Sequence, residues 1–141
     1  MNNTVAINNH HKIDSQEIIK NIGAGLCLLD KDLHIIWVNS IQEKWFATNG
    51  NICGKHCYEV FQHKNHICGG CPAVKVFKTG HVERAVQPRF IKDGKRCYFQ
   101  LTVSPIKDRQ DNIAQALEVV EDITDKVKQE REKNRIIDRL K

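Results

Sequence analysis

Residues 26–40 read LCLLDKDLHIIWVNS, two apolar runs separated by a charged turn. The first run covers residues 26–29 and the second covers residues 33–38, which are lengths typical of buried strands. Asp30-Lys31-Asp32 between them favours a turn. This stretch therefore predicts a β-hairpin. Ser40, with Glu43 three residues later, has the spacing of a capping box and predicts a helix over residues 41–47.

The rest of the chain extends this hairpin into a mixed α+β pattern. Asp14 and Glu17 predict a helix over residues 14–22. Further helices are expected over residues 55–61 and 72–79, followed by strands over 81–91, 96–106 and 112–123 and a charged helix from Thr124. This order predicts a five-stranded antiparallel sheet with short helices on one face. We expect a flexible tail over residues 1–13, one domain over residues 14–123 and a C-terminal helix over residues 124–141 with a weak coiled-coil seam.

Composition excludes several classes of protein. The chain has 141 residues, with 22 Lys and Arg against 17 Asp and Glu, and it lacks the dense basic stripe of a nucleic-acid-binding protein. No apolar run approaches the roughly 18 residues that a membrane span needs. Met1–Lys12 is polar, without the apolar core of a signal peptide, so we expect a cytoplasmic protein. The absence of a Gly-x-Ser-x-Gly, P-loop or His-Glu-x-x-His motif predicts that it is not an enzyme.

Six cysteines are unexpected in a cytoplasmic chain, where disulfides are rare and grouped cysteines more often bind metal or carry out redox chemistry. Four of them form the pattern Cys53-x3-Cys57-x10-Cys68-x2-Cys71. If the first pair is helical, its thiols face the same way. Gly69-Gly70 permits a tight turn between the second pair, and Cys71 precedes Pro72 at an expected helix start, where the helix dipole favours thiolate. The two pairs therefore predict one metal site.

The spacing alone leaves the occupant of this site open. Four thiolates suit tetrahedral zinc and also a [4Fe–4S] or [2Fe–2S] cluster. In a zinc site, His56, His63 or His66 could replace one cysteine. A thiol–disulfide switch and cysteines without any cofactor are further alternatives. Cys27 and Cys97 lie in apolar strands and are expected to be core residues.

The local motifs, taken in order, resemble the PAS family of sensory domains. Residues 29–40 resemble the first hairpin of that family, which ends in an Asn at a helix start. Residues 51–55 (NICGK) resemble the start of its next helix, and Asp122-Ile123-Thr124 is similar to the motif that closes many PAS domains and opens a signalling helix. The resemblance covers about residues 14–125. It implies the strand order 2-1-5-4-3 and a pocket between the sheet and the short helices.

A narrower resemblance involves the cysteines. Residues 54–61 (GKHCYEVF) and 68–72 (CGGCP) are similar to a Cys-rich PAS subgroup, resembling the iron–sulfur PAS domains of bacterial sensor kinases. Cysteines matching Cys57, Cys68 and Cys71 are usual in that subgroup, whereas Cys53 is an addition. In the four-cysteine iron–sulfur domains both pairs are Cys-x2-Cys, so the Cys-x3-Cys pair here departs from that pattern.

The resemblance implies a function in signal transduction. It implies a redox or oxygen sensor with a cluster on Cys53, Cys57, Cys68 and Cys71, [4Fe–4S] being favoured over [2Fe–2S]. It also implies a homodimer formed through the flanking helices and an output effector domain, such as the histidine kinase of a two-component system. The alternatives are a PAS ligand-binding or dimerisation module with structural zinc, and a thiol–disulfide switch.

Flavin and haem are not expected. Residues 54–57 (GKHC) resemble the Gly-x-x-Cys of light-sensing flavin PAS domains, but residues 58–61 (YEVF) follow in place of the polar set that holds the flavin ring. Haem PAS domains take an axial histidine from the helix after this loop. Residues 72–79 contain no histidine, and His81 lies just beyond them.

Overall fold

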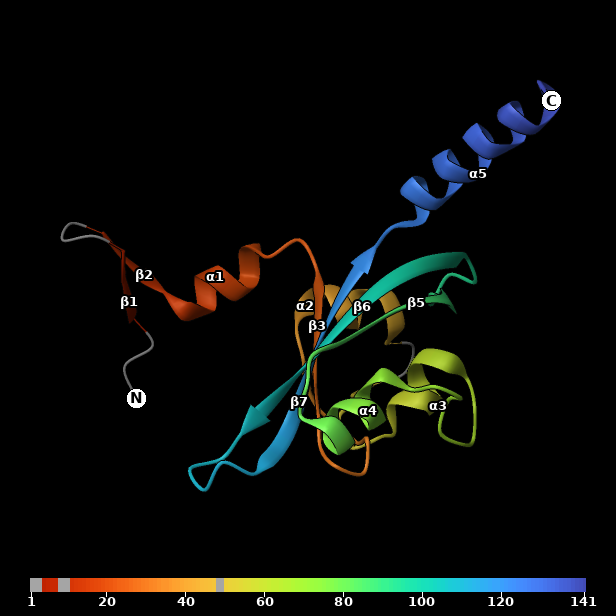
Figure 1. Ribbon diagram of the computed structural model, residues 1–141. Helices are drawn as coiled ribbons and strands as arrows, with labels where there is room; N and C mark the ends of the chain where they lie inside the picture. The colour runs from red at the N-terminus through yellow and green to blue at the C-terminus, as the bar shows by residue number, and fades with distance from the viewer. Residues whose placement is uncertain (1–3, 8–10, 48–49) are drawn as a thin grey trace.

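The computed structural model describes residues 4–7, 11–47 and 50–141, and its centre is a five-stranded antiparallel sheet (Figure 1). The strands are β3 (Gly25–Leu29), β4 (Ile35–Val38), β5 (Glu83–Phe90), β6 (Arg96–Lys107) and β7 (Ile113–Asp122). Their spatial order is β4-β3-β7-β6-β5. Counted along the chain this is 2-1-5-4-3, which confirms the predicted α+β PAS fold.

Three short helices connect β4 to β5 and pack against the sheet. They are α2 (Ser40–Phe46), α3 (Cys57–Gln62) and α4 (Pro72–Thr79). Helix α2 contacts β3, α3 contacts β5, and α4 contacts β5, β6 and β7. The core lies between these helices and the sheet, with side chains at most 4% exposed from both layers: Cys27, Leu29, Ile35, Phe46, Phe61, Val76, Cys97, Phe99, Leu101, Val103 and Val120. Cys27 and Cys97 are therefore core residues, as predicted.

Helix α2 begins one residue earlier than the sequence predicts. Its N-cap is Asn39, whose Oδ1 accepts hydrogen bonds from the backbone N–H of Gln42 at 3.1 Å and of Leu26 at 2.9 Å. Its Nδ2 donates to the carbonyl of Ala24 at 2.9 Å. Asn39 thus caps the helix and joins it to β3, a double role that the simpler capping-box interpretation of Ser40 missed.

Regular structure also appears in the expected N-terminal tail. β1 (Thr4–Ile7) pairs antiparallel with β2 (His11–Asp14), and α1 (Ser15–Asn21) follows. The N-cap of α1 is Asp14, whose Oδ1 accepts the N–H of Gln16 at 3.0 Å, in agreement with the predicted helix start. The two four-residue strands were too short to predict from periodicity. Residues 1–3 and 8–10, also part of the expected tail, lie outside the described residues.

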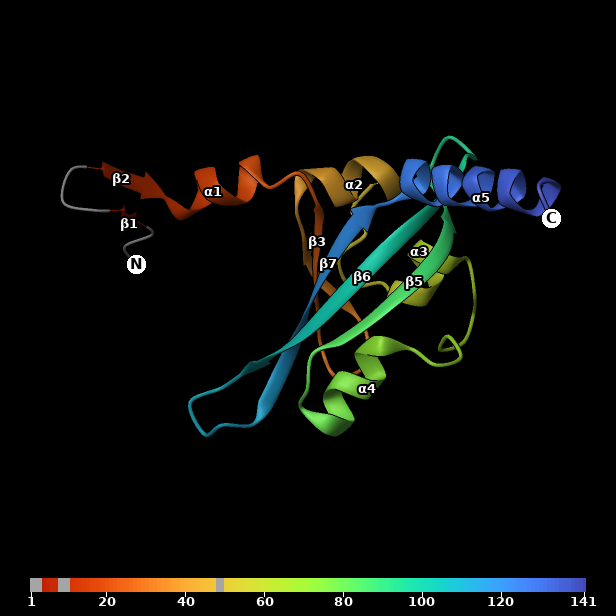
Figure 2. The same cartoon turned by 45° about the horizontal axis from the view of Figure 1, so that its top comes forward.

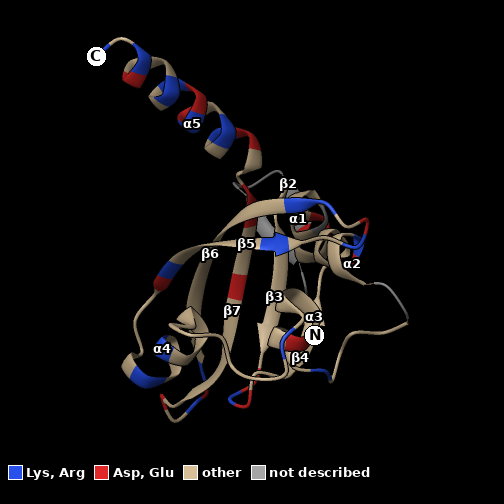
Figure 3. Ribbon diagram, turned by 90° about the vertical axis from the view of Figure 1, so that its right-hand side faces the viewer, with Lys and Arg blue, Asp and Glu red and all other residues tan. Residues whose placement is uncertain are grey.

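The C-terminal helix α5 (Thr124–Arg139) projects away from the sheet (Figures 1 and 2). Basic and acidic side chains alternate along it, whereas most of the sheet carries neither (Figure 3). Over the described residues, no helix has both the length and the apolar character that a bilayer crossing requires.

Candidate functional site

Three of the four grouped cysteines line one small cavity between α3, α4 and the sheet. Cys57, Cys68 and Cys71 all form part of its wall, and its volume is about 20 Å³. That is the space that about one water molecule needs. Gln87, Arg89 and Glu118 also line it. The structure therefore brings three of the predicted ligands to one small, partly polar cavity.

Cys57 is held by the first hairpin. It is the first residue of α3, and its backbone N–H donates to the carbonyl of Leu33 at 2.9 Å. Just before it, Gly54 N donates to Ile35 O at 2.7 Å, and Ile35 N donates to Lys55 O at 2.8 Å. These bonds fix the start of α3 against the residues that lead into β4.

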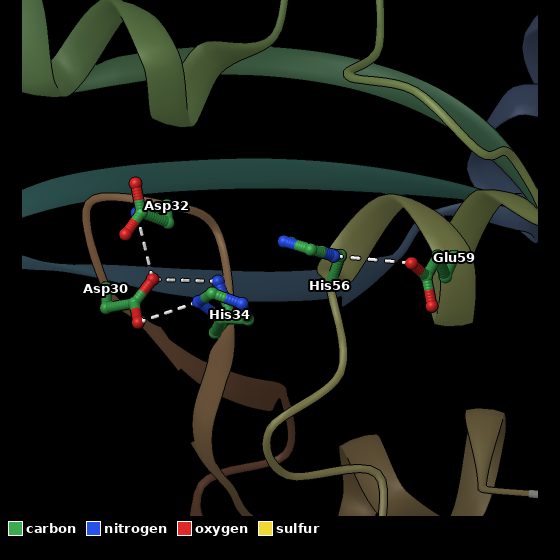
Figure 4. A network of polar contacts seen from close by, with 5 residues as sticks. All are labelled: Asp30, Asp32, His34, His56 and Glu59. Atoms are coloured by element: carbon green, nitrogen blue, oxygen red, sulfur yellow. Dashed lines mark hydrogen bonds and ion pairs between the residues drawn. The ribbon is translucent and has the colours of Figure 1, made fainter.

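A second set of polar contacts also joins the β3–β4 turn to the start of α3 (Figure 4). The imidazoles of His34 and His56 stack with ring centroids 4.3 Å apart. His34 Nδ1 contacts Asp30 Oδ2 at 3.0 Å, and His56 Nδ1 contacts Glu59 Oε1 at 3.3 Å. His56 directly precedes Cys57, so this network adds to the rigidity of the Cys57 position.

Cys53 occupies a different environment from its predicted partner. It lies in the turn before α3, where Gly54 has a φ of +89°, so Cys53 and Cys57 do not share one helix. Its backbone N–H donates to Asn51 Oδ1 at 3.0 Å, and it packs against the hydrophobic core. It is not part of the wall of the cavity that the other three line.

Cys68 and Cys71 flank the predicted glycine turn. Gly70 has a φ of +66°, which L-residues rarely adopt and which allows the chain to reverse before α4. Cys71 is the N-cap of α4, and Pro72 begins the helix as predicted. Burial raises the pKa of the Cys71 thiol, while hydrogen bonds from the backbone N–H groups of Val74 and Ala73 act in the opposite direction.

A buried ion pair forms the sheet side of the cavity. Nη2 of Arg89, on β5, donates to Oε1 of Glu118, on β7, at 3.2 Å, and both side chains are 4% exposed. The same Nη2 donates to Gln87 Oε1 at 3.2 Å, an oxygen that also accepts from Gln62 Nε2 at 2.9 Å. The guanidinium carbon lies 5.2 Å from the ring centroid of Phe61.

The ion pair leaves Arg89 incompletely satisfied. Within the described residues, its Nε and Nη1 atoms are buried and have no hydrogen-bond partner. An unpaired buried donor costs about 1–3 kcal/mol, and more when the group is charged. The cavity therefore contains unused donors beside three thiols.

Burial and charge keep the thiols of Cys57 and Cys71 protonated. Burial raises the pKa of Cys57 well above its usual value, and the carboxylate of Glu118 raises it further, while Arg89 lowers it. The same causes raise the pKa of Cys27, which pairs with Glu118 in the sheet register. Thiolate at this site therefore requires compensating positive charge, which a bound metal supplies.

The arrangement can be tested against the two metal centres that the sequence left open. Tetrahedral zinc at a Zn–S distance of 2.3 Å places its sulfurs about 3.8 Å apart. Among the described residues, the one group of three or more candidate ligands within 4.8 Å of one another is Asp30, Asp32 and His34. The cysteines therefore do not form a closed zinc site in this conformation. In a [4Fe–4S] cluster each cysteine binds a different iron, so its sulfurs lie further apart than those of a zinc site, and the donors here are of the soft kind that such clusters use.

The acidic group itself has a structural explanation. The carboxylate of Asp30 accepts hydrogen bonds from the backbone N–H groups of Asp32 and His34, at 2.9 and 2.8 Å, and contacts the imidazole of His34 (Figure 4). These contacts close the turn between β3 and β4.

Sequence reasoning missed the ion pair, although a signal was present. Ala116, Glu118 and Val120 alternate on β7 and all face the core, so Glu118 is a charge at an apolar position. Arg89 likewise stands at a buried position of an edge strand whose alternate residues are exposed. A charge at a core-facing strand position is rare without a partner, and two such positions of opposite sign predict a pair.

The comparisons with known proteins agree with this fold. A family model described as "PAS fold" matches residues 19–128, which is more than half of the chain. Among curated proteins, none shows significant sequence similarity to this chain.

Several solved structures are similar in fold at low sequence identity. "Structure of an RNA-binding Light-Oxygen-Voltage Receptor" superposes with a TM-score of 0.72 at 12% identity, covering 88% of this chain and 36% of that one. A sensory box sensor histidine kinase from Vibrio cholerae gives a TM-score of 0.56 at 21% identity, covering 78% of this chain and 90% of that one. "VqmA bound to DPO" gives 0.65 at 16% identity and covers 79% of this chain.

This chain spans only part of the first solved structures that it matches, covering 57%, 51% and 53% of three VqmA chains. At these identities the likeness concerns the fold alone. Together with the matching family model and the observed strand order, it leads to one conclusion: the chain belongs to the PAS fold family.

Proposed function

We propose that this chain is a sensory PAS module that responds to redox state or oxygen through an iron–sulfur cluster on Cys53, Cys57, Cys68 and Cys71. A [4Fe–4S] cluster is favoured over a [2Fe–2S] cluster. The observation that carries the proposal is that three of these thiols line one small cavity beside a buried arginine. When bound, such a cluster supplies a one-electron redox centre whose potential depends on nearby charge and hydrogen bonds.

The chain's own residues hold the ligands in different ways. Cys57 and Cys71 stand at the first turns of α3 and α4, where backbone hydrogen bonds fix them. Cys68 lies in the loop between these helices, next to Gly69-Gly70, so it is the ligand with the greatest freedom to adjust. Cys53, four residues before Cys57, packs against the same core but outside this cavity, so as the fourth ligand it requires the turn before α3 to bring its thiol to the other three.

The site has a direct structural connection to α5. Glu118 lies on β7, four residues before Asp122, whose Oδ1 accepts the N–H of Thr124 at 2.9 Å at the start of α5. Thr124 Oγ1 accepts the N–H of Tyr98, on β6, at 3.0 Å. A change in the loop that carries Cys68, if it shifts the sheet, therefore reaches the C-terminal helix through a continuous series of hydrogen bonds.

For the output we propose a homodimer through the flanking helices α1 and α5, joined to an effector domain such as a histidine kinase of a two-component system. The projecting helix α5 supports this. Ile136 and Ile137 on it are 49% and 43% exposed, apolar residues on a helix that otherwise carries charge. Sedimentation of the chain, compared with its Ile137→Glu variant, tests the dimer, and an unchanged mass would contradict this interface.

The ligand assignment is tested by replacing two cysteines. The Cys68→Ser/Cys71→Ser variant, purified without oxygen, should contain less than a tenth of the wild-type iron and sulfide. Cys97→Ala is the matched control, because it also removes a cysteine but from the core on β6. Full metal retention in the double variant would overturn the assignment.

A second candidate function is a thiol–disulfide switch between Cys68 and Cys71. It is favoured by their shared cavity, where backbone N–H donors oppose the rise that burial causes in the pKa of Cys71. Closing that bond would remove two electrons and two protons to an oxidant. Metal-free protein that shows a Cys68–Cys71 disulfide, titratable with dithiothreitol, would favour this function over the cluster.

A further inference from the structure

The two free donors of Arg89 have a specific position. Arg89 is 5% exposed and lines the cavity of Cys57, Cys68 and Cys71. In the described part of the chain, its buried Nε and Nη1 have no hydrogen-bond partner. Folded proteins leave few buried polar groups unpaired, and those that remain call for an explanation. Because three thiols line the same cavity, these donors suit an acceptor bound to, or formed by, those thiols.

The charges around the cavity support the same conclusion. Arg89 and Glu118 together are neutral, and the contact between them is a single one through Nη2. Cysteines that bind a metal do so as thiolates, so a centre with three or four of them is anionic. Such a centre would lie beside the carboxylate of Glu118, and Arg89 is the buried cation that lines the same cavity.

We propose that Arg89 is the charge partner of the cysteine-bound centre. Its Nε and Nη1 donate hydrogen bonds to the cysteine sulfurs, while Glu118 and Gln87 hold the guanidinium through Nη2. The proposal rests on the proposed function to the extent that the same cysteines bind a metal. It predicts opposite effects at the two ends of the ion pair, because removing Glu118 removes a negative charge that competes with the thiolates.

The experiment uses Co²⁺ as a probe that does not depend on the natural metal. Metal-free, reduced chain is titrated with Co²⁺ without oxygen, and the thiolate-to-cobalt charge-transfer absorbance gives the affinity. Three variants are compared with wild type: Arg89→Lys, Glu118→Gln and Arg84→Lys. Arg89→Lys keeps the positive charge but removes the two free donors. Arg84 is the matched control, since it lies on the same strand with an exposed side chain.

Arg89→Lys should bind Co²⁺ at least about tenfold more weakly, since hydrogen bonds to charged groups contribute about this much. Glu118→Gln should bind it more tightly, and Arg84→Lys should match wild type. An equal loss of Co²⁺ affinity in Arg89→Lys and Glu118→Gln would show that the ion pair is merely structural, and it would overturn the proposal. So would unchanged affinity in all variants, or a wild type that does not bind Co²⁺.

The same titration separates this proposal from the proposed function. If anaerobically purified wild type lacks iron and sulfide, and the Co²⁺ affinities still follow the expected order, the cluster assignment is wrong and the role of Arg89 stands. If iron and sulfide are present but Arg89→Lys binds Co²⁺ as wild type does, the cluster assignment stands and the role of Arg89 is wrong. Circular dichroism of each variant, and the opposite direction expected for Glu118→Gln, exclude unfolding as the cause.

Discussion

Nη2 of Arg89 and Oε1 of Glu118 lie 3.2 Å apart in the core of the domain, where each side chain is 4% exposed. The two residues come from β5 and β7, which are separated in the sheet by β6. Arg89 therefore reaches across a strand along the core face to meet its partner. Buried ion pairs contribute little net stability compared with apolar residues of similar size, so fold stability alone does not explain this pair.

Removing one member of this pair should destabilise the protein more than removing both. Arg89→Met or Glu118→Leu alone leaves an uncompensated buried charge, which costs about 3–5 kcal/mol. The double variant Arg89→Met/Glu118→Leu should recover most of that loss. Urea unfolding of the metal-free protein provides the four free energies of a double-mutant cycle, and strictly additive losses would refute the expected coupling.

Gly25 should tolerate no side chain. A Cβ at this position would overlap Gln42 Oε1 and lie 2.8 Å from Cζ3 of Trp45, where α2 packs on β3. Gly25→Ala should therefore cost about 1–3 kcal/mol of unfolding free energy. Gly23→Ala is the control, since nothing lies within 4 Å of a Cβ there. If the two variants have the same midpoint of unfolding, the conclusion that α2 packs too closely on β3 to admit a side chain at residue 25 is wrong.

Five of the six thiols should differ in reactivity in a fixed order. Iodoacetamide at pH 7.5 should label Cys53 and Cys68 in the metal-free protein before Cys27 and Cys97, which are 0% and 3% exposed. Cys57 should also label slowly, because burial raises its pKa and keeps it a thiol.

Peptide mass spectrometry over time measures this order. Raising the pH from 7.5 to 9 should accelerate labelling at Cys57 by about tenfold per pH unit while leaving it slow in absolute terms, since the pKa of this thiol lies well above both pH values and thiolate stays a small fraction that rises in proportion to pH. Rapid labelling of Cys57 at pH 7.5 would contradict its buried, protonated state.

The start of α5 should depend on Thr124. Its Oγ1 accepts the N–H of Tyr98 at 3.0 Å and donates to Asp122 Oδ1, and the residue is 6% exposed. Thr124→Val removes both bonds while keeping the shape, which should cost about 1–2 kcal/mol. Hydrogen–deuterium exchange should then increase in α5 and at Tyr98, with little change in β3. Uniform exchange across the domain would contradict a local role.

Most of the fold could be predicted because its signals are local. The hairpin of residues 26–38 and Pro72 at a helix start depend on near neighbours in the sequence, and the structure confirms both, although the second strand begins at Ile35 and not at Leu33, whose φ is +67°. The capping-box spacing placed the N-cap of α2 at Ser40 in place of Asn39, because both residue types cap helices and spacing does not reveal the bonds that fix Asn39 to β3. The N-terminal hairpin was missed because four-residue strands have too little periodicity.

The candidate site could be predicted only in part, for a physical reason. The cysteines are recognisable from residue type and spacing, and three of them line one cavity. The Cys53–Cys57 geometry depended on whether Gly54 continues a helix, and its φ of +89° shows that it does not. The pair of Arg89 and Glu118 joins residues 29 positions apart, so it depends on strand order and register rather than on any local motif.

The most direct test of the account is metal analysis of the chain purified without oxygen. Iron, acid-labile sulfide and zinc should be measured together with the visible spectrum before and after exposure to air. We predict brown protein with equal amounts of iron and sulfide, whose colour bleaches in air. Colourless protein with one zinc per chain, or with none of the three elements, would contradict a cluster-based sensor.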